Sequence, residues 1–242
     1  MIGDRATTEE TRRRIAANIA RVRATIAEAA RRAGRQADEI TLVAVSKTMP
    51  LAWVQIAYNE GVTDFGENRV QDALPKVAAF HPPGMRWHMI GHVQTNKGRK
   101  VAEAFDAVQS VDSLHLAETL DRYAGVRGKS LPVLLQVNIS GEASKEGMTP
   151  EETPALARRI AALPALAVQG LMTIAPLARD PEEARPAFRG LRLLREQLRQ
   201  ELPEIAWLHL SMGMTDDYAI AIEEGATIVR VGRAIFGERV HT

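Results

Sequence analysis

A lysine at the end of a β-prone run is the first residue whose setting suggests chemistry. Lys47 is one of 6 lysines, against 25 arginines, and it follows the apolar run at residues 42–45. Side chains alternate along a strand, so Val43, Val45 and Lys47 are expected on one face. Burial lowers the pKa of a lysine and exposes a neutral amine that can attack a carbonyl to form a Schiff base. A lysine that reaches from the strand end into solvent is the alternative, and position alone does not separate the two.

Two turns near the C-terminus have the composition of an anion site. They read Ser211-Met212-Gly213-Met214-Thr215 and Val231-Gly232-Arg233-Ala234. Small residues let backbone N–H groups approach a ligand closely, and each turn is expected to open a helix, whose N-terminus favours an anion. The hydroxyls of Ser211 and Thr215 would add donors, although Thr215 could equally cap its helix. A phosphate site opposite a carbonyl-reactive amine describes pyridoxal 5′-phosphate well.

An arginine in an apolar run is the third candidate. Arg230 lies in the run at residues 227–231 and shares a strand face with Ile228. A guanidinium inside a protein core needs an acceptor. The acceptor could be the ring nitrogen of a bound pyridine or an acid on another strand. An arginine at the ring nitrogen would keep that atom unprotonated and weaken the ring as an electron sink.

The remaining polar residues are less specific. Asn68 and Gln94 could bond to the edge of a ligand, although Asn68 could instead cap a helix. His88 and His92 straddle a strand end and are not part of H-E-x-x-H, so no metal site is expected. Ser211 lacks the G-x-S-x-G elbow of a serine nucleophile. We therefore predict cofactor binding without an assigned catalytic residue.

An alternation of strands and helices must position these residues. Eight β-prone runs alternate with helical stretches, which favours a parallel sheet. The runs cover residues 41–46, 62–65, 86–90, 107–111, 133–139, 167–174, 206–210 and 227–231. Eight repeats predict an α/β fold with a single (β/α)8 TIM barrel, whose functional end is the C-terminal end of the strands. An open doubly wound sheet is the alternative, but no G-x-G-x-x-G follows the first run.

An extra helix is expected before the barrel, over about residues 8–33. Thr7 and Glu10 fit a capping box, and Gly34 would end the helix. Its arginines are interpreted as a solvated face. The barrel is expected over about residues 40–239, and because no Pro/Gly/Ser-rich linker divides the chain, we predict one domain over residues 1–242.

Composition narrows the class of protein. The chain has 242 residues, 45% of them hydrophobic and 25% charged, with a net charge of +1 and no cysteine. Disulfides, thiolate chemistry and cysteine metal sites are therefore excluded. The charge balance gives no reason to expect a nucleic-acid partner, and no apolar run is long enough to span a membrane. With no secretory signal recognised, we expect a soluble, cytoplasmic protein.

Five separated segments carry a resemblance to a known family. They are Leu42-Val43-Ala44-Val45-Ser46-Lys47, Phe65-Gly66-Glu67-Asn68-Arg69-Val70-Gln71, Trp87-His88-Met89-Ile90-Gly91-His92-Val93-Gln94-Thr95-Asn96-Lys97, Leu210-Ser211-Met212-Gly213-Met214-Thr215-Asp216-Asp217 and Val229-Arg230-Val231-Gly232-Arg233-Ala234-Ile235-Phe236-Gly237. In order and spacing they closely resemble the pyridoxal phosphate homeostasis protein family over about residues 8–239.

The resemblance implies a barrel like the N-terminal domain of alanine racemase. It implies that pyridoxal 5′-phosphate is held as a Schiff base on Lys47, that Arg230 faces the pyridine nitrogen, and that Ser211 and Gly232-Arg233 lie in the segments that hold the phosphate. Arg233 stands where some relatives have a small hydroxyl residue, so the resemblance assigns its backbone rather than its side chain. The cofactor-binding set that we predict is Lys47, Asn68, Ser211, Met212, Thr215, Arg230, Gly232 and Arg233.

Three functions follow from these features. The resemblance implies a protein of vitamin B6 homeostasis, with pyridoxal 5′-phosphate and client enzymes as partners and no established reaction. We separately expect a monomer. A racemase is the alternative, but it needs acid/base groups on both faces of the substrate carbon. Lys47 could serve one face, whereas Tyr58, Tyr123 and Tyr218 all fall in helical stretches, and a separate C-terminal domain is not expected. Nucleic-acid binding by the arginine-rich first helix has no base-reading motif to support it.

Overall fold

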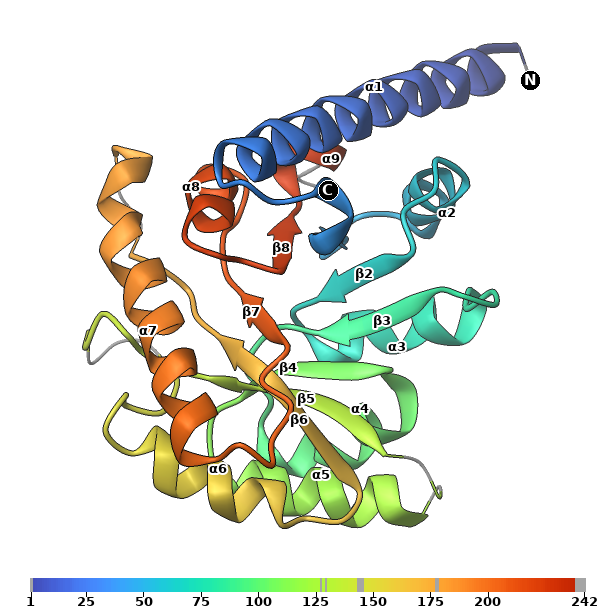
Figure 1. The fold of residues 1–242 in the computed structure, drawn as a ribbon. Coiled ribbons are helices and arrows are strands. Elements are labelled where there is room, and N and C mark those ends of the chain that lie inside the picture. Colours follow the sequence, from blue (N-terminus) through green and yellow to red (C-terminus); the bar gives the residue numbers. More distant parts are fainter. Residues whose placement is uncertain (1, 127, 129, 143–145, 177–178, 238–242) are drawn as a thin grey trace.

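Eight parallel strands close into a barrel in sequence order, with helices around them (Figure 1). The computed structural model describes residues 2–126, 128, 130–142, 146–176 and 179–237, with the backbone alone for residues 2–8. The strands are β1 (Thr41–Val45), β2 (Asp64–Glu67), β3 (Arg86–Met89), β4 (Ala107–Val111), β5 (Leu131–Gln136), β6 (Leu166–Met172), β7 (His209–Ser211) and β8 (Ile228–Val231). Because β1 pairs with both β2 and β8, the predicted (β/α)8 barrel is confirmed and the open sheet is wrong.

The helices alternate with the strands along the chain. They are α1 (Ile2–Arg32), α2 (Leu51–Asn59), α3 (Val70–Ala79), α4 (Gly98–Ala104), α5 (Leu114–Val126), α6 (Thr153–Ala161), α7 (Arg185–Glu201), α8 (Tyr218–Glu223) and α9 (Arg233–Phe236). Short 3₁₀ turns lie at Ala37–Glu39, Thr95–Lys97 and Pro181–Ala184. The helices that follow β7 and β8 have only 6 and 4 residues. The two turns at the C-terminus therefore open the two shortest α-helices of the described chain.

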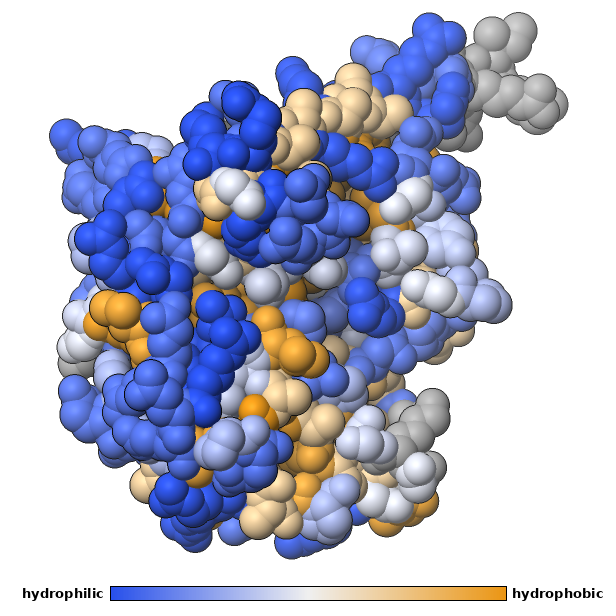
Figure 2. Space-filling view, in the orientation of Figure 1, coloured by the Kyte–Doolittle hydropathy of each residue, from blue (hydrophilic) through white to orange (hydrophobic). Residues whose placement is uncertain are grey.

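Alternation along each strand separates two cores. Outward-facing side chains such as Phe65 and Trp87 are fully buried in one large cluster between the strands and the helices. Val43, Leu134, Met172 and Ile228 form a small separate cluster inside the barrel. Most of the face shown in Figure 2 is hydrophilic. Leu193 on α7 is an exposed apolar side chain. No helix of the described segments combines the length and the apolarity needed to cross a membrane.

Helix α1 packs across the end of the chain (Figure 1). Its buried residues recur at helical spacing, as predicted, and they include Ile15, Ile19, Val22 and Ile26. The Asn18 amide donates to the Ile235 carbonyl at 2.8 Å, which joins α1 to α9. The helix begins at Ile2, so the predicted capping box at Thr7 is wrong: Thr7 lies inside the helix. Because the helical backbone already begins before Thr7, this residue does not cap the helix.

Two strands are displaced from their predicted positions. Strand β2 covers Asp64–Glu67 rather than residues 62–65, and β7 covers His209–Ser211 rather than residues 206–210. Val62 belongs to the outer core before its strand begins, and Leu208 bonds back to Ala206 in a turn. The predicted runs begin at apolar residues that lie before each strand. The strands themselves begin where the backbone pairs with the neighbouring strands. The shift in β7 changes which residues lie inside the barrel and which lie in the turn.

Candidate functional site

A cavity of about 600 Å³ opens at the C-terminal ends of β1, β2 and β8, the expected functional end of the barrel. This volume lies in the range of small-molecule sites. Six of the eight predicted cofactor-binding residues line it, namely Lys47, Asn68, Thr215, Arg230, Gly232 and Arg233. Val45, Ile90 and Ile174 add apolar walls. The cavity thus brings together residues that are up to 192 positions apart in the chain, from Val45 to Gly237.

Lys47 lies two residues beyond the end of β1, beside Val45. It is half-buried, which lies between the buried lysine and the solvent-exposed lysine that the sequence left open. The next residue, Thr48, has a left-handed backbone with φ of 65°. Such a conformation costs on the order of 1–3 kcal/mol for a residue other than glycine. The chain therefore makes a strained turn directly after the lysine.

A buried ion pair holds the backbone before Lys47. Lys76 of α3 pairs with Glu67 at 2.8 Å and also donates to the Ser46 carbonyl at 2.8 Å. The Ser46 hydroxyl donates to the same Glu67 carboxylate at 2.7 Å. Glu67 is fully buried and Ser46 is fully buried, so water does not compete for these bonds. The peptide that leads into Lys47 is thus anchored from the helix side of the barrel.

Arg230 lies inside the barrel, on the floor of the cavity. Its side chain is almost fully buried and donates to the Ser211 hydroxyl at 2.6 Å and to the Thr173 carbonyl at 2.9 Å. Within the described residues it forms no ion pair, so the alternative of an acid from another strand as its partner is wrong. Burial lowers its pKa to about 10, and Asp217 opposes this shift through space. Arg230 is therefore charged at neutral pH.

Ser211 and Met212 do not line the cavity. The Ser211 side chain is fully buried inside the barrel, where it donates to Gln109 at 2.6 Å and accepts from Arg230. The Met212 side chain belongs to the outer core, and its N–H donates to the Ile228 carbonyl. Both residues were predicted to bind the cofactor. Because β7 extends to Ser211, the turn begins later than expected and Met214, Thr215 and Asp216 reach the cavity instead.

Close packing shapes both C-terminal turns. Gly213 has φ of +91°, and a Cβ there would lie 2.5 Å from that of Ala221. A Cβ on Gly232 would lie 3.1 Å from the Val45 carbonyl oxygen. The Arg233 guanidinium bonds to Asp216, with both side chains more than half exposed, and so links the two turns. Asp217 is the residue directly before α8, so Thr215 does not cap that helix as the alternative had it. The Asp217 side chain accepts a hydrogen bond from the Met214 N–H.

Asn68 shows an unsatisfied group at the cavity. Its Oδ1 atom is buried and has no hydrogen-bond partner within the described residues. It does not cap α3, whose preceding residue is Arg69. A Cβ on Gly91 would lie 2.2 Å from the Asn68 carbonyl, so the missing side chain of Gly91 allows this approach. A buried polar atom without a partner costs about 1–3 kcal/mol. A polar ligand in the cavity would remove that cost. Gln94, by contrast, is exposed and does not line the cavity.

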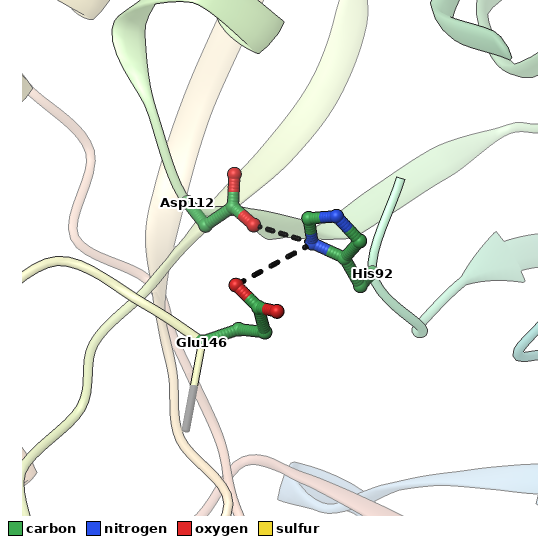
Figure 3. Close-up of side chains that lie close together, drawn as sticks. All are labelled: His92, Asp112 and Glu146. Carbon is green, nitrogen blue, oxygen red and sulfur yellow. Dashed lines mark hydrogen bonds and ion pairs between the residues drawn. The ribbon is translucent and has the colours of Figure 1, made fainter. Parts of the chain in front are cut away.

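The two histidines of β3 and its loop lie apart. His88 is buried inside the barrel, whereas His92 is half exposed at the rim. Figure 3 shows the Nδ1 atom of His92 between two carboxylates, 2.9 Å from Asp112 and 3.8 Å from Glu146. His92 and Asp112 follow the ends of β3 and β4, and Glu146 lies in the loop between β5 and α6, so sequence spacing did not reveal them. A cation would balance the two carboxylates.

The fold and the cavity together define a class: a closed parallel barrel with an amine after its first strand and a buried guanidinium on its last. The family model for the alanine racemase N-terminal domain matches residues 13–240. The pyridoxal phosphate homeostasis protein of Pseudomonas aeruginosa is 47% identical over 225 residues, which cover 93% of this chain and 96% of that protein. That of Escherichia coli is 43% identical over 235 residues, covering 93% and 97%. The chain belongs to the pyridoxal phosphate homeostasis protein family.

Solved structures agree with this membership. PipY of Synechococcus elongatus, solved with PLP bound, has a TM-score of 0.82 and 38% identity over 92% of this chain and 100% of that chain. Alanine racemase of Clostridium difficile has a TM-score of 0.69 with 14% identity, over 83% of this chain and 55% of that chain. The second likeness shows a shared barrel fold alone.

Proposed function

We propose that this chain binds pyridoxal 5′-phosphate covalently at Lys47 and serves vitamin B6 homeostasis as a binding protein. The observation that carries the proposal is that one cavity is lined by half-buried Lys47 and buried, charged Arg230. The orphaned Asn68 oxygen and the bare backbone at Gly232 fit a polar ligand that approaches closely. When bound, the cofactor supplies an aldehyde that condenses with an amine and a ring that can accept electrons.

Each side of the cavity would hold a different part of the cofactor. Lys47 would hold the aldehyde carbon, and Arg230 would face the ring nitrogen. The turns at Thr215 and at Gly232-Arg233 would hold the phosphate through backbone N–H groups, and Asn68 would bond to a polar edge of the ring. Ser211, predicted as a phosphate ligand, is assigned instead to Arg230, because its hydroxyl is already bonded inside the barrel.

The chain's own residues favour binding over catalysis. Arg230 remains protonated at neutral pH, so it does not protonate the ring nitrogen and leaves the ring a weak electron sink. Racemisation also needs a second acid/base group. No tyrosine of the described chain lines the cavity: Tyr58 bonds to the Pro83 carbonyl, Tyr123 lies on α5, and Tyr218 is buried in the outer core.

Borohydride trapping tests the covalent site. The purified protein is loaded with pyridoxal 5′-phosphate, reduced, digested and mapped, and we expect the label on the peptide that contains Lys47. Lys47→Ala should lose the label and the absorbance of the bound cofactor, whereas Lys100→Ala, at an exposed position on α4, should keep both. A label on Lys97 or Lys145 would overturn the assignment.

Proton exchange tests the absence of a reaction. The loaded protein is incubated with single enantiomers of alanine and serine in deuterated water, and α-proton exchange is followed by NMR. We expect exchange well below about 1 s⁻¹, the low end of typical enzymes. Faster exchange that depends on Lys47 would establish a racemase instead. Transfer of the cofactor to an added apo-enzyme, measured as recovered activity, tests delivery to client enzymes.

A further inference from the structure

A continuous chain of hydrogen bonds crosses the interior of the barrel from the cavity floor to the opposite end. Arg230 donates to the Ser211 hydroxyl at 2.6 Å, and Ser211 donates to Gln109 Oε1 at 2.6 Å. The other end of the Gln109 amide, Nε2, lies 3.1 Å from Nδ1 of His88. Nε2 of His88 lies 2.8 Å from Oδ1 of Asp64. We call these five residues the relay.

The relay is built from five different strands and is shielded from water. Its members lie on β8, β7, β4, β3 and β2, and none is more than 5% exposed. Only Arg230 lines the cavity at the mouth. Gln109, His88 and Asp64 line a second cavity of about 150 Å³ with Arg86 and His209, residues at the starts of β3 and β7. The relay thus joins the two ends of the barrel.

Charges at the two ends set the direction of every bond in the relay. Arg230 can only donate, and the Asp64 carboxylate can only accept. Asp64 is held as an anion: burial opposes its ionisation, but bonds from His88 and Arg86 outweigh burial and lower its pKa to about 2. His88 must therefore donate through Nε2, which leaves Nδ1 of a neutral ring as the acceptor for Gln109. Every proton then points from the mouth towards Asp64.

The reversed arrangement leaves a group unsatisfied. If Nδ1 of His88 carried a proton, the Gln109 amide would have to turn so that its oxygen faced the ring. Its NH₂ group and Arg230 would then both donate to Ser211, whose own hydroxyl proton would have no acceptor in the relay. Inside a core, an unsatisfied polar group is costly. The neutral Nε2–H form of His88 is thus the one that satisfies all members.

We propose that Gln109, His88 and Asp64 are positioning residues, which act through Ser211 to hold Arg230 as a fixed donor at the floor of the cavity. Without the relay, Ser211 could rotate and the guanidinium would lose one of its two bonds inside the barrel. The ligand feature selected in this way is an acceptor atom facing Arg230, such as an unprotonated ring nitrogen. The proposal rests on the proposed function only for the identity of that ligand.

Substitution of the middle residue tests the relay on the bound ligand. Gln109→Met keeps the approximate volume and removes both hydrogen bonds, and Gln169→Met is the matched control, since Gln169 lines the same small cavity outside the relay. Each variant is titrated with pyridoxal 5′-phosphate and with its deaza analogue, in which C–H replaces the ring nitrogen. We expect Gln109→Met to weaken binding of the phosphate cofactor about 5- to 20-fold, the effect of one hydrogen bond, and to change binding of the analogue less than about 2-fold. Equal losses for both ligands, or an equal loss in the control, would overturn the proposal.

NMR of the unaltered protein without ligand tests the direction of the relay by itself. ¹⁵N shifts of the His88 ring at pH 7 should show a neutral imidazole with the proton on Nε2. A ring protonated on Nδ1 would overturn the direction even if the cofactor binds. Conversely, if the unaltered protein fails to bind pyridoxal 5′-phosphate while His88 shows the expected form, the proposed function fails and the relay stands.

Discussion

The outward and inward faces of the barrel strands carry different kinds of side chain, and two adjacent residues of β3 show the difference. Trp87 points outward into a large apolar core shared with the helices, whereas His88 points inward to Asp64 and Gln109. The outer face contains almost entirely apolar side chains. The inner face combines four clustered apolar residues with the five polar residues of the relay. We infer that stability resides mainly in the outer core and ligand recognition mainly in the interior.

The largest expected effect comes from the outer core. Phe188 on α7 is fully buried there, and Phe188→Ala should lower the free energy of unfolding by about 3–5 kcal/mol. Urea unfolding of the ligand-free protein measures this loss. The folded fraction should still bind the cofactor with near-normal affinity. A loss below about 1 kcal/mol, within the ordinary range of a surface change, would break the contrast between the two faces.

A turn at the mouth should show an intermediate effect. Gly213→Ala adds a Cβ 2.5 Å from Ala221, at φ of +91°. Gly84→Ala is its control, since Gly84 has φ of +83° but no atom within 4 Å of the added Cβ. We expect Gly213→Ala to destabilise the protein by about 1–3 kcal/mol more than the control, from overpacking, and to weaken cofactor binding as the turn moves. Equal effects would show that the backbone conformation alone matters.

Asp64 inside the barrel should make the free energy of unfolding depend on pH in the acid range. Because the pKa of Asp64 is about 2 in the folded protein and near 3.8 in the unfolded chain, the unfolded state takes up the proton first as pH falls. Stability supplied by Asp64 is thus present above pH 4 and lost between about pH 4 and pH 2, with a size of about 2 kcal/mol. Urea titrations across this range should show the loss, and Asp64→Asn should remove it. Asp38→Asn, at an exposed position, should leave the profile unchanged.

The smallest effect is expected at the rim. The side chains of Arg233 and Asp216 are more than half exposed, and exposed ion pairs contribute at most about 1 kcal/mol. Arg233→Ala should therefore change the affinity for pyridoxal 5′-phosphate by less than about fivefold, since we assign the phosphate to the backbone. Isothermal titration measures the difference. A hundredfold loss would show that the guanidinium itself binds the phosphate.

Sequence patterns were sufficient for the barrel, because strand and helix periodicity repeats eight times and each repeat is local. They were sufficient for Lys47 and Arg230 as cavity residues, since Lys47 is a charged group shortly after an apolar run and Arg230 is one within such a run. They were not sufficient for Ser211. Strand β7 extends one residue beyond its predicted end, so Ser211 lies in the barrel wall with its hydroxyl bonded inside the barrel and not in the turn, and no local signal sets that boundary.

The relay shows a second limit. Asp64, His88 and Gln109 are single polar residues on separate strands, and their partners lie 21–102 positions away. Each could be interpreted as an ordinary strand residue on its own. The cluster of His92, Asp112 and Glu146 escaped notice for the same reason (Figure 3). Pairing of consecutive strands brings together His92, Asp112 and Glu146, and likewise Asp64, His88 and Gln109. Closure of the barrel adds the bond from Ser211 of β7 to Gln109 of β4.

The packing of α1 against α9 also has a consequence for how the chain folds. Asn18 and its partner Ile235 are separated by 217 positions, and β1 can pair with β8 only when nearly all of the chain is present. Helix α1 packs against α2, which follows it closely in the chain, but also against α8 and α9, which are synthesised much later. Contacts between such distant segments slow folding. Part of the buried face of α1 therefore stays uncovered until the segments after β7 have been synthesised, and ring closure is the step that ends this exposure.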